Sequence, residues 1–451
     1  MKVEQFQDKH LSQYSYAVLS ESSKQIILID PSRNPEPYLR FAGQHGADII
    51  GVIETHPHAD FVSSHLEFQQ REGARIYGSR LQRTTYSLTP FDEGDVLEIG
   101  NIRLKAVNTP GHSPDSISVV LEHQGKDTAV FTGDTLFVGD CGRPDLRESG
   151  KDEQTLRESL ARQLYHSLRE KLLPLPDEAV MYPGHGAGSL CGKSLSDAST
   201  SSLGAERRQN WSLQEMSEDQ FVRELTADLP FIPAYFRYNV ELNQRGAPEY
   251  QSSTAGIPIR KAPVTESDAE RISKDLWVVD VRDEKEYKRG HLPHSVNIME
   301  GERFETWLGS VIRPGEDFYL AGSDENQLKK LIGRCASIGY ESQIREAFIL
   351  GNSGQRSQTV DLPAFRNQPD LFTILDVRNP AEVRDRTFFD SSLKIPLPEL
   401  RNRIREIPTG KPVAVHCSAG YRSAIASSLL ASEFRDRTPV YDIGEAIKDF
   451  G

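Results

Sequence analysis

The feature that most constrains this chain is an internal repeat in its second half. The segment LWVVDVRDEKEY around Asp280 is matched by FTILDVRNPAEV around Asp376, which lies 96 residues later. Each copy reads as a buried apolar strand that ends in Asp-Val-Arg and runs into the start of a helix. The repeat predicts two tandem α/β units at residues 260–356 and 357–451.

A separate domain of residues 1–255 is expected before the repeat, because the Pro- and Gln-bearing segment 243–263 reads as a linker. Short apolar strands alternate there with turns rich in Gly and Pro, and a helical pattern covers residues 152–168. The expected strands are 25–30, 47–54, 102–107, 116–122, 128–134 and 179–184.

Histidine and aspartate residues follow four of these strands, each in a tight turn. The turns are THPHAD (55–60), TPGH (109–112), TGD (132–134) and YPGH (182–185). Any one of them is ordinary turn chemistry, because His and Asp are common after strands. Four such turns in order instead predict a metal site, held where the strand ends meet.

The four turns resemble the motifs of the metallo-β-lactamase superfamily over about the first 190 residues. The usual first motif is H-x-H-x-D-H, but here its last position is Phe61, whose ring cannot coordinate a metal. His65 lies four residues further on, a spacing that does not match the motif. The departure weakens a two-zinc hydrolase reading and favours a single metal.

Within that superfamily the chain most resembles the persulfide dioxygenases. The residues that carry this resemblance are GDTLF (133–137), CGRPD (141–145) and the HADF that ends at Phe61. The resemblance implies an αββα sandwich and one Fe(II) per domain, with O2 as co-substrate. Carried over by motif, the ligands are His56, His112 and Asp134. Two histidines and a carboxylate leave open positions for substrate and O2, whereas spacing alone does not separate iron from zinc.

The resemblance also implies residues that orient the ligands or contact the persulfide, namely His58, Asp60, Arg143, Tyr182 and His185. Arg143 has two readings, a holder of an anionic thiol carrier or a solvated surface side chain.

The four cysteines are far apart and form no CxxC pair, which favours a reducing compartment over a disulfide framework. Cys335 lies in a helical pattern and is expected in the core, and Cys141 is expected to be structural. Cys191 is flanked by Gly188 and Gly192 and followed by Lys193. We therefore expect an exposed turn whose thiolate is favoured by the lysine, and we hypothesise that Cys191 relays sulfur as a persulfide. An incidental loop thiol is the alternative.

Cys417 is the strongest candidate nucleophile. It follows the apolar strand 412–415 and opens the loop CSAGYR, which leads directly into an apolar helix. Backbone N–H groups and a helix N-terminus around a sulfur stabilise its thiolate, and Arg422 adds a positive charge. A buried, silent cysteine is the alternative. The C-x4-R loop resembles that of the rhodanese sulfurtransferases. In the first repeat Ala321 and Asn326 stand where Cys417 and Arg422 stand, so that copy is expected to be a structural spacer or docking surface.

Taken together, the chain resembles persulfide dioxygenases fused to tandem rhodanese domains, the first of them silent. This implies oxidation of a low-molecular-weight thiol persulfide to sulfite, followed by formation of thiosulfate through Cys417. The carrier, of glutathione, coenzyme A or bacillithiol type, stays open. The alternatives are a thioester hydrolase of the glyoxalase II type and a non-catalytic persulfide carrier or sensor.

Charge and hydropathy limit the partners. The net charge of −13 argues against nucleic acid, and no stretch approaches the roughly 20 apolar residues of a membrane span. The first ten residues, MKVEQFQDKH, contain no apolar signal region. We therefore expect a cytoplasmic enzyme without a membrane partner, and a chain of this kind is expected to form a homo-oligomer.

Overall fold

The computed structural model describes residues 1–147, 153–264, 268, 272, 276–351 and 354–450. The chain divides into two compact units. The first consists of Met1–Gln251 with Ala336–Gly339, and the second of Ser252–Cys335 with Tyr340–Gly451. Among the described residues, no helix is both long enough and apolar enough to cross a bilayer.

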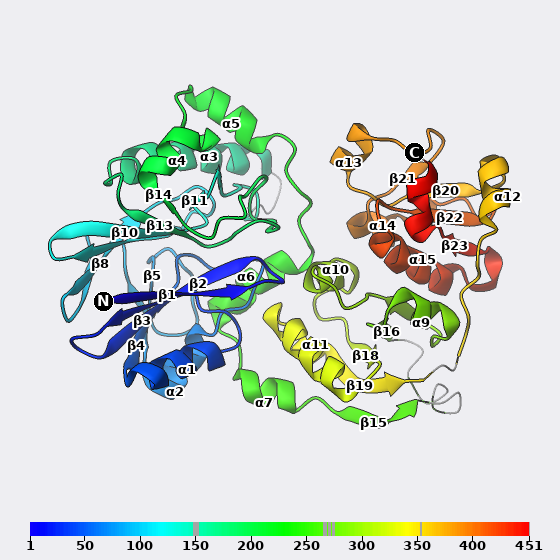
Figure 1. Cartoon of the computed structure of the whole chain (residues 1–451), viewed down its shortest axis with the longest axis horizontal. Coiled ribbons are helices and arrows are strands. Elements are labelled where there is room, and N and C mark those ends of the chain that lie inside the picture. The colour runs from blue at the N-terminus through cyan, green and yellow to red at the C-terminus, as the bar shows by residue number, and fades with distance from the viewer. Residues whose placement is uncertain (148–152, 265–267, 269–271, 273–275, 352–353, 451) are drawn as a thin grey trace. The chain divides into compact units, whose positions relative to one another are not determined.

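The first unit contains two six-stranded sheets and a short hairpin (Figure 1). The first sheet has the order β1 (Lys2–Asp8), β2 (Gln13–Ser20), β3 (Gln25–Ile29), β4 (Asp48–Ile53), β5 (Arg75–Gly78) and β6 (Leu88–Pro90). The second has the order β14 (Ser201–Ser202), β13 (Val180–Pro183), β10 (Lys126–Gly133), β9 (Ile117–His123), β8 (Ile102–Asn108) and β7 (Val96–Ile99). The hairpin pairs β11 (Leu136–Phe137) with β12 (Asp140–Cys141).

The strands carry apolar side chains on both of their faces, which explains why helices cover the outer face of each sheet. On β2, Tyr16 and Val18 point into the core between the sheets, while Ala17 and Leu19 point to the opposite face. Successive strand residues face opposite sides, so a strand that is apolar at every position must be covered on both. Helices α1 (Glu36–His45) and α2 (His65–Glu72) pack on this outer face of the first sheet.

The second sheet follows the same rule. On β10, Phe131 faces the core between the sheets and Val130 faces the helices. These helices are α3 (Glu153–His166), α4 (Leu203–Gln209) and α5 (Glu218–Thr226), and α6 (Tyr235–Arg245) and α7 (Tyr250–Ala255) follow in sequence. The predicted αββα sandwich is therefore confirmed.

The second unit contains two parallel sheets. The first has the order β15 (Ile259–Val264), β19 (Ile344–Leu350), β18 (Phe318–Gly322), β16 (Trp277–Asp280) and β17 (Ser295–Asn297). The second has the order β23 (Val440–Asp442), β22 (Val413–His416), β20 (Thr373–Asp376) and β21 (Leu393–Lys394). The helices are α9 (Glu284–Arg289), α10 (Phe304–Val311), α11 (Glu325–Ser337), α12 (Leu362–Asn367), α13 (Pro380–Asp385), α14 (Leu400–Arg403) and α15 (Tyr421–Phe434).

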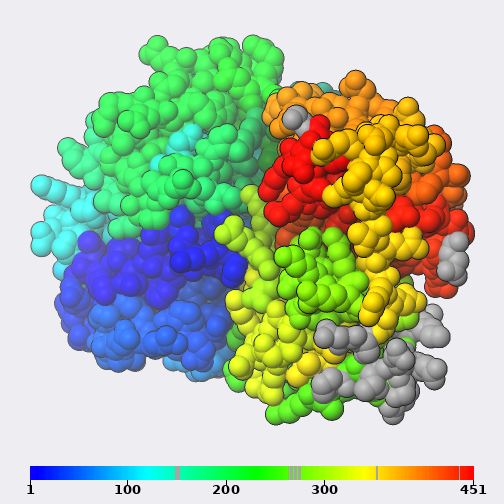
Figure 2. Space-filling model, turned by 45° about the vertical axis from the view of Figure 1, so that its right-hand side comes forward, coloured from blue at the N-terminus to red at the C-terminus, as the bar shows by residue number. Residues whose placement is uncertain are grey.

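The two halves of this unit repeat the same design. Strands β19-β18-β16-β17 and β23-β22-β20-β21 have the same order, and each central strand ends in a buried aspartate paired with the arginine two residues later. Asp280 and Arg282 approach to 2.6 Å, and Asp376 and Arg378 to 2.7 Å. Figure 2 shows the two halves side by side, the first in yellow and green and the second in orange and red.

Candidate active sites

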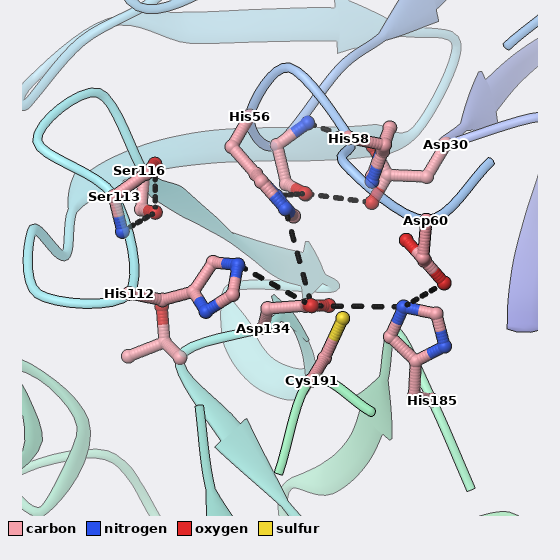
Figure 3. Close-up of polar contacts among 12 residues, drawn as sticks. Asp30, His56, His58, Asp60, His112, Ser113, Ser116, Asp134, His185 and Cys191 are labelled. Carbon is pink, nitrogen blue, oxygen red and sulfur yellow. Dashed lines mark hydrogen bonds and ion pairs between the residues drawn. The ribbon is translucent and has the colours of Figure 1, made fainter. Parts of the chain in front are cut away.

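The four sequence turns meet at one edge of the sandwich in the first unit (Figure 3). His56 follows β4, His112 follows β8, Asp134 ends the turn after β10, and His185 follows β13. All four side chains are buried. They gather because the two sheets bring these strand ends together, as the strand-and-turn pattern predicted.

His56, His112 and Asp134 form a group that could hold a metal, with one ligand atom from each and all three atoms within 4.8 Å of one another. Nε2 of His112 lies 3.5 Å from Oδ2 of Asp134, and Nε2 of His56 lies 3.9 Å from the same oxygen. Neither carboxylate oxygen of Asp134 has a hydrogen-bond partner among the described residues. A buried carboxylate without partners is costly unless a cation or proton compensates it, so the donor set fits a divalent metal.

Hydrogen bonds fix which nitrogen each histidine offers. Nδ1 of His112 lies 2.9 Å from the carbonyl oxygen of Arg143, so it must carry the proton. The Thr55 hydroxyl donates to Asp30 and therefore accepts from Nδ1 of His56, at 3.0 Å. Nε2 of both rings is then left as a lone-pair donor directed at Asp134.

Burial sets the protonation of this group. It lowers the pKa of His112 to about 3 and that of His56 well below its usual value, with neighbouring histidines adding to the effect for His56. Burial also raises the pKa of Asp134 to about 6. At neutral pH the metal-free group therefore holds two neutral imidazoles and one carboxylate, the protonation state in which all three bind metals.

Two glycines allow the close approach of these turns. Gly133 has φ +49°, and a Cβ there would lie 2.6 Å from Oγ1 of Thr55. A Cβ on Gly184 would lie 2.4 Å from Oδ1 of Asp134. A larger residue would displace Thr55 in the first case and the Asp134 carboxylate in the second, which explains a glycine before both Asp134 and His185.

His58 is directed away from this group. Its Nε2 lies 3.1 Å from Oδ1 of Asp30 and 3.3 Å from Oε2 of Glu54. Burial alone would lower the pKa of His58, but the two carboxylates raise it well above its usual value. Phe61 stacks on the His58 ring at 4.2 Å between centroids. The second histidine of the first motif is thus an ion-paired support.

A second group lies on the other side of Asp134. Ligand atoms of Asp60, His185 and Cys191 all lie within 4.8 Å of one another. Nε2 of His185 is 3.3 Å from Oδ2 of Asp60 and 3.6 Å from Oδ2 of Asp134. Nδ1 of His185 lies 3.1 Å from the Ser12 carbonyl oxygen, so its Nε2 also faces the site. Asp60, His185 and Cys191 therefore line the side of Asp134 that faces away from His56 and His112.

In the second unit, Cys417 is buried at the start of a loop between β22 and α15. The backbone N–H of Gly420 donates to its Sγ at 3.1 Å, and the N-terminus of the 14-residue helix α15 follows at once. One backbone N–H and a helix N-terminus thus lie beside the sulfur, as the loop sequence predicted.

Arg422 is bound by a carboxylate. Its guanidinium donates to both oxygens of Glu382, at 2.5 and 2.6 Å. Burial alone would lower the pKa of Arg422, but this ion pair raises it, and the same pair lowers the pKa of Glu382 to about 2. Sequence reasoning missed Glu382, which lies on α13, far from the loop in the chain.

Comparisons with known proteins identify the family of each part of the chain. The family model of the Metallo-beta-lactamase superfamily matches residues 11–185. A solved structure titled a metallo-beta-lactamase from Staphylococcus aureus is 32% identical, with a TM-score of 0.68, over 78% of this chain and 99% of that chain. The chain belongs to the metallo-β-lactamase superfamily. A rhodanese-like domain follows the metallo-β-lactamase domain, since that family model matches residues 265–363.

Two relatives of the metallo-β-lactamase domain carry different activities. The cytoplasmic hydroxyacylglutathione hydrolase of Arabidopsis thaliana is 30% identical over 273 residues, which cover 58% of this chain and 95% of that protein. The human mitochondrial persulfide dioxygenase ETHE1 is 29% identical over 174 residues, which cover 38% of this chain and 63% of that protein.

Three expectations about the metallo-β-lactamase domain are corrected by the structure. Arg143 is neither solvated nor free to hold a carrier, because its buried guanidinium donates to both Asp145 oxygens and to two backbone carbonyls. Its backbone reaches the site instead: its carbonyl accepts from Nδ1 of His112, and its N–H donates to the Cys191 carbonyl. Tyr182 is half-buried, stacks on Phe131 and packs against the core between the sheets, so it is a packing residue.

Cys191 is the third correction. The expected exposed turn is wrong, because Cys191 is 1% exposed. Burial and the carboxylates of Asp60 and Asp134 raise the pKa of its thiol well above the usual value. Lys193 does not favour a thiolate there, since its ammonium donates to the Glu224 carbonyl. The buried positions of Cys141 and Cys335 are confirmed.

Asp30 and Glu54 are supports that sequence reasoning missed. Asp30 accepts from the backbone N–H and hydroxyl of Thr55, both at 2.7 Å, and also faces His58. Its φ of +49° is unusual for a residue other than glycine. A signal was available in part, because each residue ends a predicted strand directly before a turn.

Proposed function

We propose that the chain is a non-haem Fe(II) persulfide dioxygenase joined to a thiosulfate-forming sulfurtransferase. Persulfide dioxygenase relatives and a rhodanese-like domain in one chain support an enzyme of sulfur metabolism. The substrate in this proposal is a low-molecular-weight thiol persulfide, and sulfite links the two sites.

One observation carries the first half of the proposal. His56, His112 and Asp134 converge with lone pairs on a common point, while His58, the residue that would complete an all-histidine face, is held by Asp30 and Glu54. Two histidines and one carboxylate on one side are the ligand set of mononuclear iron oxygenases. Fe(II) held by these residues would supply the activation of O2.

The other residues of the site shape the place for the substrate. The side chains of Asp60, His185 and Cys191 face the free side of the group, so a persulfide there lies among polar atoms. Overall, the persulfide sulfur, O2 and water yield sulfite, free thiol and protons, with the outer sulfur oxidised and O2 reduced.

The second half rests on the Cys417 cradle. The Cys417 sulfur attacks the outer sulfur of a second thiol persulfide, the S–S bond of that persulfide breaks and the carrier thiol leaves. Cys417 then holds the sulfur as a persulfide beside the Gly420 N–H and the start of α15. Sulfite then removes this sulfur as thiosulfate. Both sites in one chain raise the effective concentration of sulfite near its acceptor.

The proposed dioxygenase activity is tested by measuring metal content and O2 uptake on the same protein. Protein purified without chelators should hold about one iron per chain and consume O2 with glutathione persulfide. His112→Ala and Asp134→Ala should lose both, because each removes one of three ligands, whereas His166→Ala on the exposed end of α3 should lose neither. Stoichiometric iron in both ligand variants would refute the assignment.

A thioester hydrolase of the glyoxalase II type is the second candidate. It is favoured by the hydroxyacylglutathione hydrolase relative and by the group of Asp60, His185 and Cys191, which gives the domain a second set of donors. Two equivalents of zinc with rapid hydrolysis of S-lactoylglutathione, and no O2 uptake, would establish this activity instead.

A further inference from the structure

The pocket above Cys417 has walls from both repeats of the second unit. Its volume is about 550 Å³. The second repeat contributes Asn379, Glu382, Cys417, Ala419, Tyr421 and Arg422, and the first contributes Gly301, Glu302, Arg303 and Trp307. The silent repeat, which was expected to be a structural spacer or docking surface, therefore also contributes to this pocket.

Direct contacts fix the first repeat against the pocket. The Tyr421 hydroxyl donates to the Met299 carbonyl, and a Cβ on Gly301 would lie 2.9 Å from the Tyr421 ring. Further along, the Asn297 N–H donates to Oγ of Ser428 at 2.9 Å. The segment before α10 is thus held against the start of α15, which also carries the Cys417 loop.

The two arginines of this pocket differ in whether a carboxylate binds them. Both terminal nitrogens of Arg422 donate to Glu382, so this ion pair contributes no net charge. Its guanidinium lies 6.0 Å from the ring centroid of Trp307. Arg303 is exposed and, among the described residues, forms no ion pair. Glu302 beside it is also exposed and brings a negative charge.

We propose that the silent repeat supplies Arg303 as the anion-recognising residue of the sulfur-transfer pocket. The ligand is a small divalent oxyanion of the sulfite class, so this inference rests on the proposed sulfur transfer at Cys417. An acceptor with two negative charges needs a cation that no carboxylate already holds, and the planar guanidinium can donate two parallel hydrogen bonds to a pair of oxyanion oxygens.

The transfer step shows where that charge acts. The sulfur lone pair of sulfite attacks the outer sulfur of the Cys417 persulfide, and a new S–S bond forms. The bond between this sulfur and Sγ breaks, and its electron pair stays on Cys417 as thiolate. No outside oxidant or reductant is needed. Sulfite and thiosulfate each carry two negative charges, so Arg303 acts on acceptor and product through their oxygens, and the loading of sulfur onto Cys417 does not depend on it.

Single-turnover discharge of the full-length protein tests this role. Cys417 is first loaded with glutathione persulfide, and mass spectrometry checks that it gains one sulfur atom. Discharge is then followed against sulfite and, separately, against 2-mercaptoethanol, a thiol acceptor without oxyanion oxygens. Arg303→Ala should raise the half-saturating sulfite concentration roughly three- to tenfold, because the arginine is exposed and partly screened. Discharge to 2-mercaptoethanol should not change.

Two further variants give the sign of the effect. Arg303→Lys should recover part of the sulfite affinity, and Glu302→Gln should lower the half-saturating sulfite concentration. Equal slowing with both acceptors, or unchanged sulfite dependence in Arg303→Ala, would overturn the inference while leaving sulfur transfer intact. Failure of wild-type Cys417 to gain sulfur would instead refute the proposed transfer itself.

Discussion

Acidification should weaken metal binding at the His56, His112 and Asp134 group by only about one power of ten between pH 7 and pH 5. A metal competes with protons for its ligands, so affinity falls as pH drops through each ligand's pKa. Asp134 has a pKa of about 6 and takes up nearly one proton in this interval, which costs about tenfold in affinity. His112, with a pKa of about 3, and His56 take up none. Two exposed histidines with ordinary pKa values would instead cost roughly 600-fold.

Competition with a chromophoric chelator under anaerobic conditions measures this slope, with the chelator's own proton uptake subtracted. Asp134→Asn should weaken binding at both pH values and flatten the slope, whereas Asp127→Asn, on β10 but remote from the site, should match wild type. A wild-type loss of two or more powers of ten would mean that the histidines titrate, which contradicts the neutral imidazoles inferred from their burial.

Three further outcomes are expected. Cys417→Ser should keep O2 uptake near the wild-type rate while chromatography shows sulfite in place of thiosulfate. Adding Ala321→Cys should not restore thiosulfate, because the loop of the first repeat also has Asn326 in place of the arginine. Unchanged thiosulfate formation by Cys417→Ser would place the transfer elsewhere. Phe61→His puts a polar ring at a position that is 1% exposed, so urea melts should show an unfolding free energy lower by about 1–3 kcal/mol. The variant should also bind a second metal more readily than the wild type. Faster O2 uptake by this variant would contradict a mononuclear site. Cys191→Ser should bind iron normally and give wild-type products, because the Cys191 thiol is buried and its pKa is raised, and mass spectrometry should find added sulfur on Cys417 but not on Cys191 or Cys335. Added sulfur on Cys191 with an altered sulfite-to-thiosulfate ratio would instead support the relay.

The sequence predicted the elements whose signals are local. Strands such as β4 and β10 are apolar runs that end in a ligand-bearing turn, and a run of this kind needs no knowledge of its neighbours. The convergence of His56, His112 and Asp134 followed because each lies at the end of a strand of one sandwich. The repeat around Asp280 and Asp376 was equally visible, and the structure gives both copies the same Asp–Arg pair.

Exposure and partners were not predictable in the same way. The glycines around Cys191 read as an exposed turn, but the turn folds inward, and its thiol lies near Asp60 and His185. Arg143 looked available because its partner Asp145, two residues away, carries no periodic signal. Glu382 pairs with Arg422 across 40 residues of sequence, and such a pairing depends on how α13 packs.

The position of Arg303 and Trp307 in the wall of the Cys417 pocket has a consequence for anyone who dissects this chain. A fragment of residues 357–451 has its own four-stranded sheet, its own Asp–Arg pair and an intact CSAGYR loop. Such a fragment would accept sulfur onto Cys417 yet present that sulfur at an open surface, without the wall that Gly301, Arg303 and Trp307 supply. Persulfide loading and acceptor selection would then separate. If the proposed transfer takes place there, the boundary of the folded repeat is not the boundary of the catalytic part, and the smallest piece able to choose its acceptor would begin before α10.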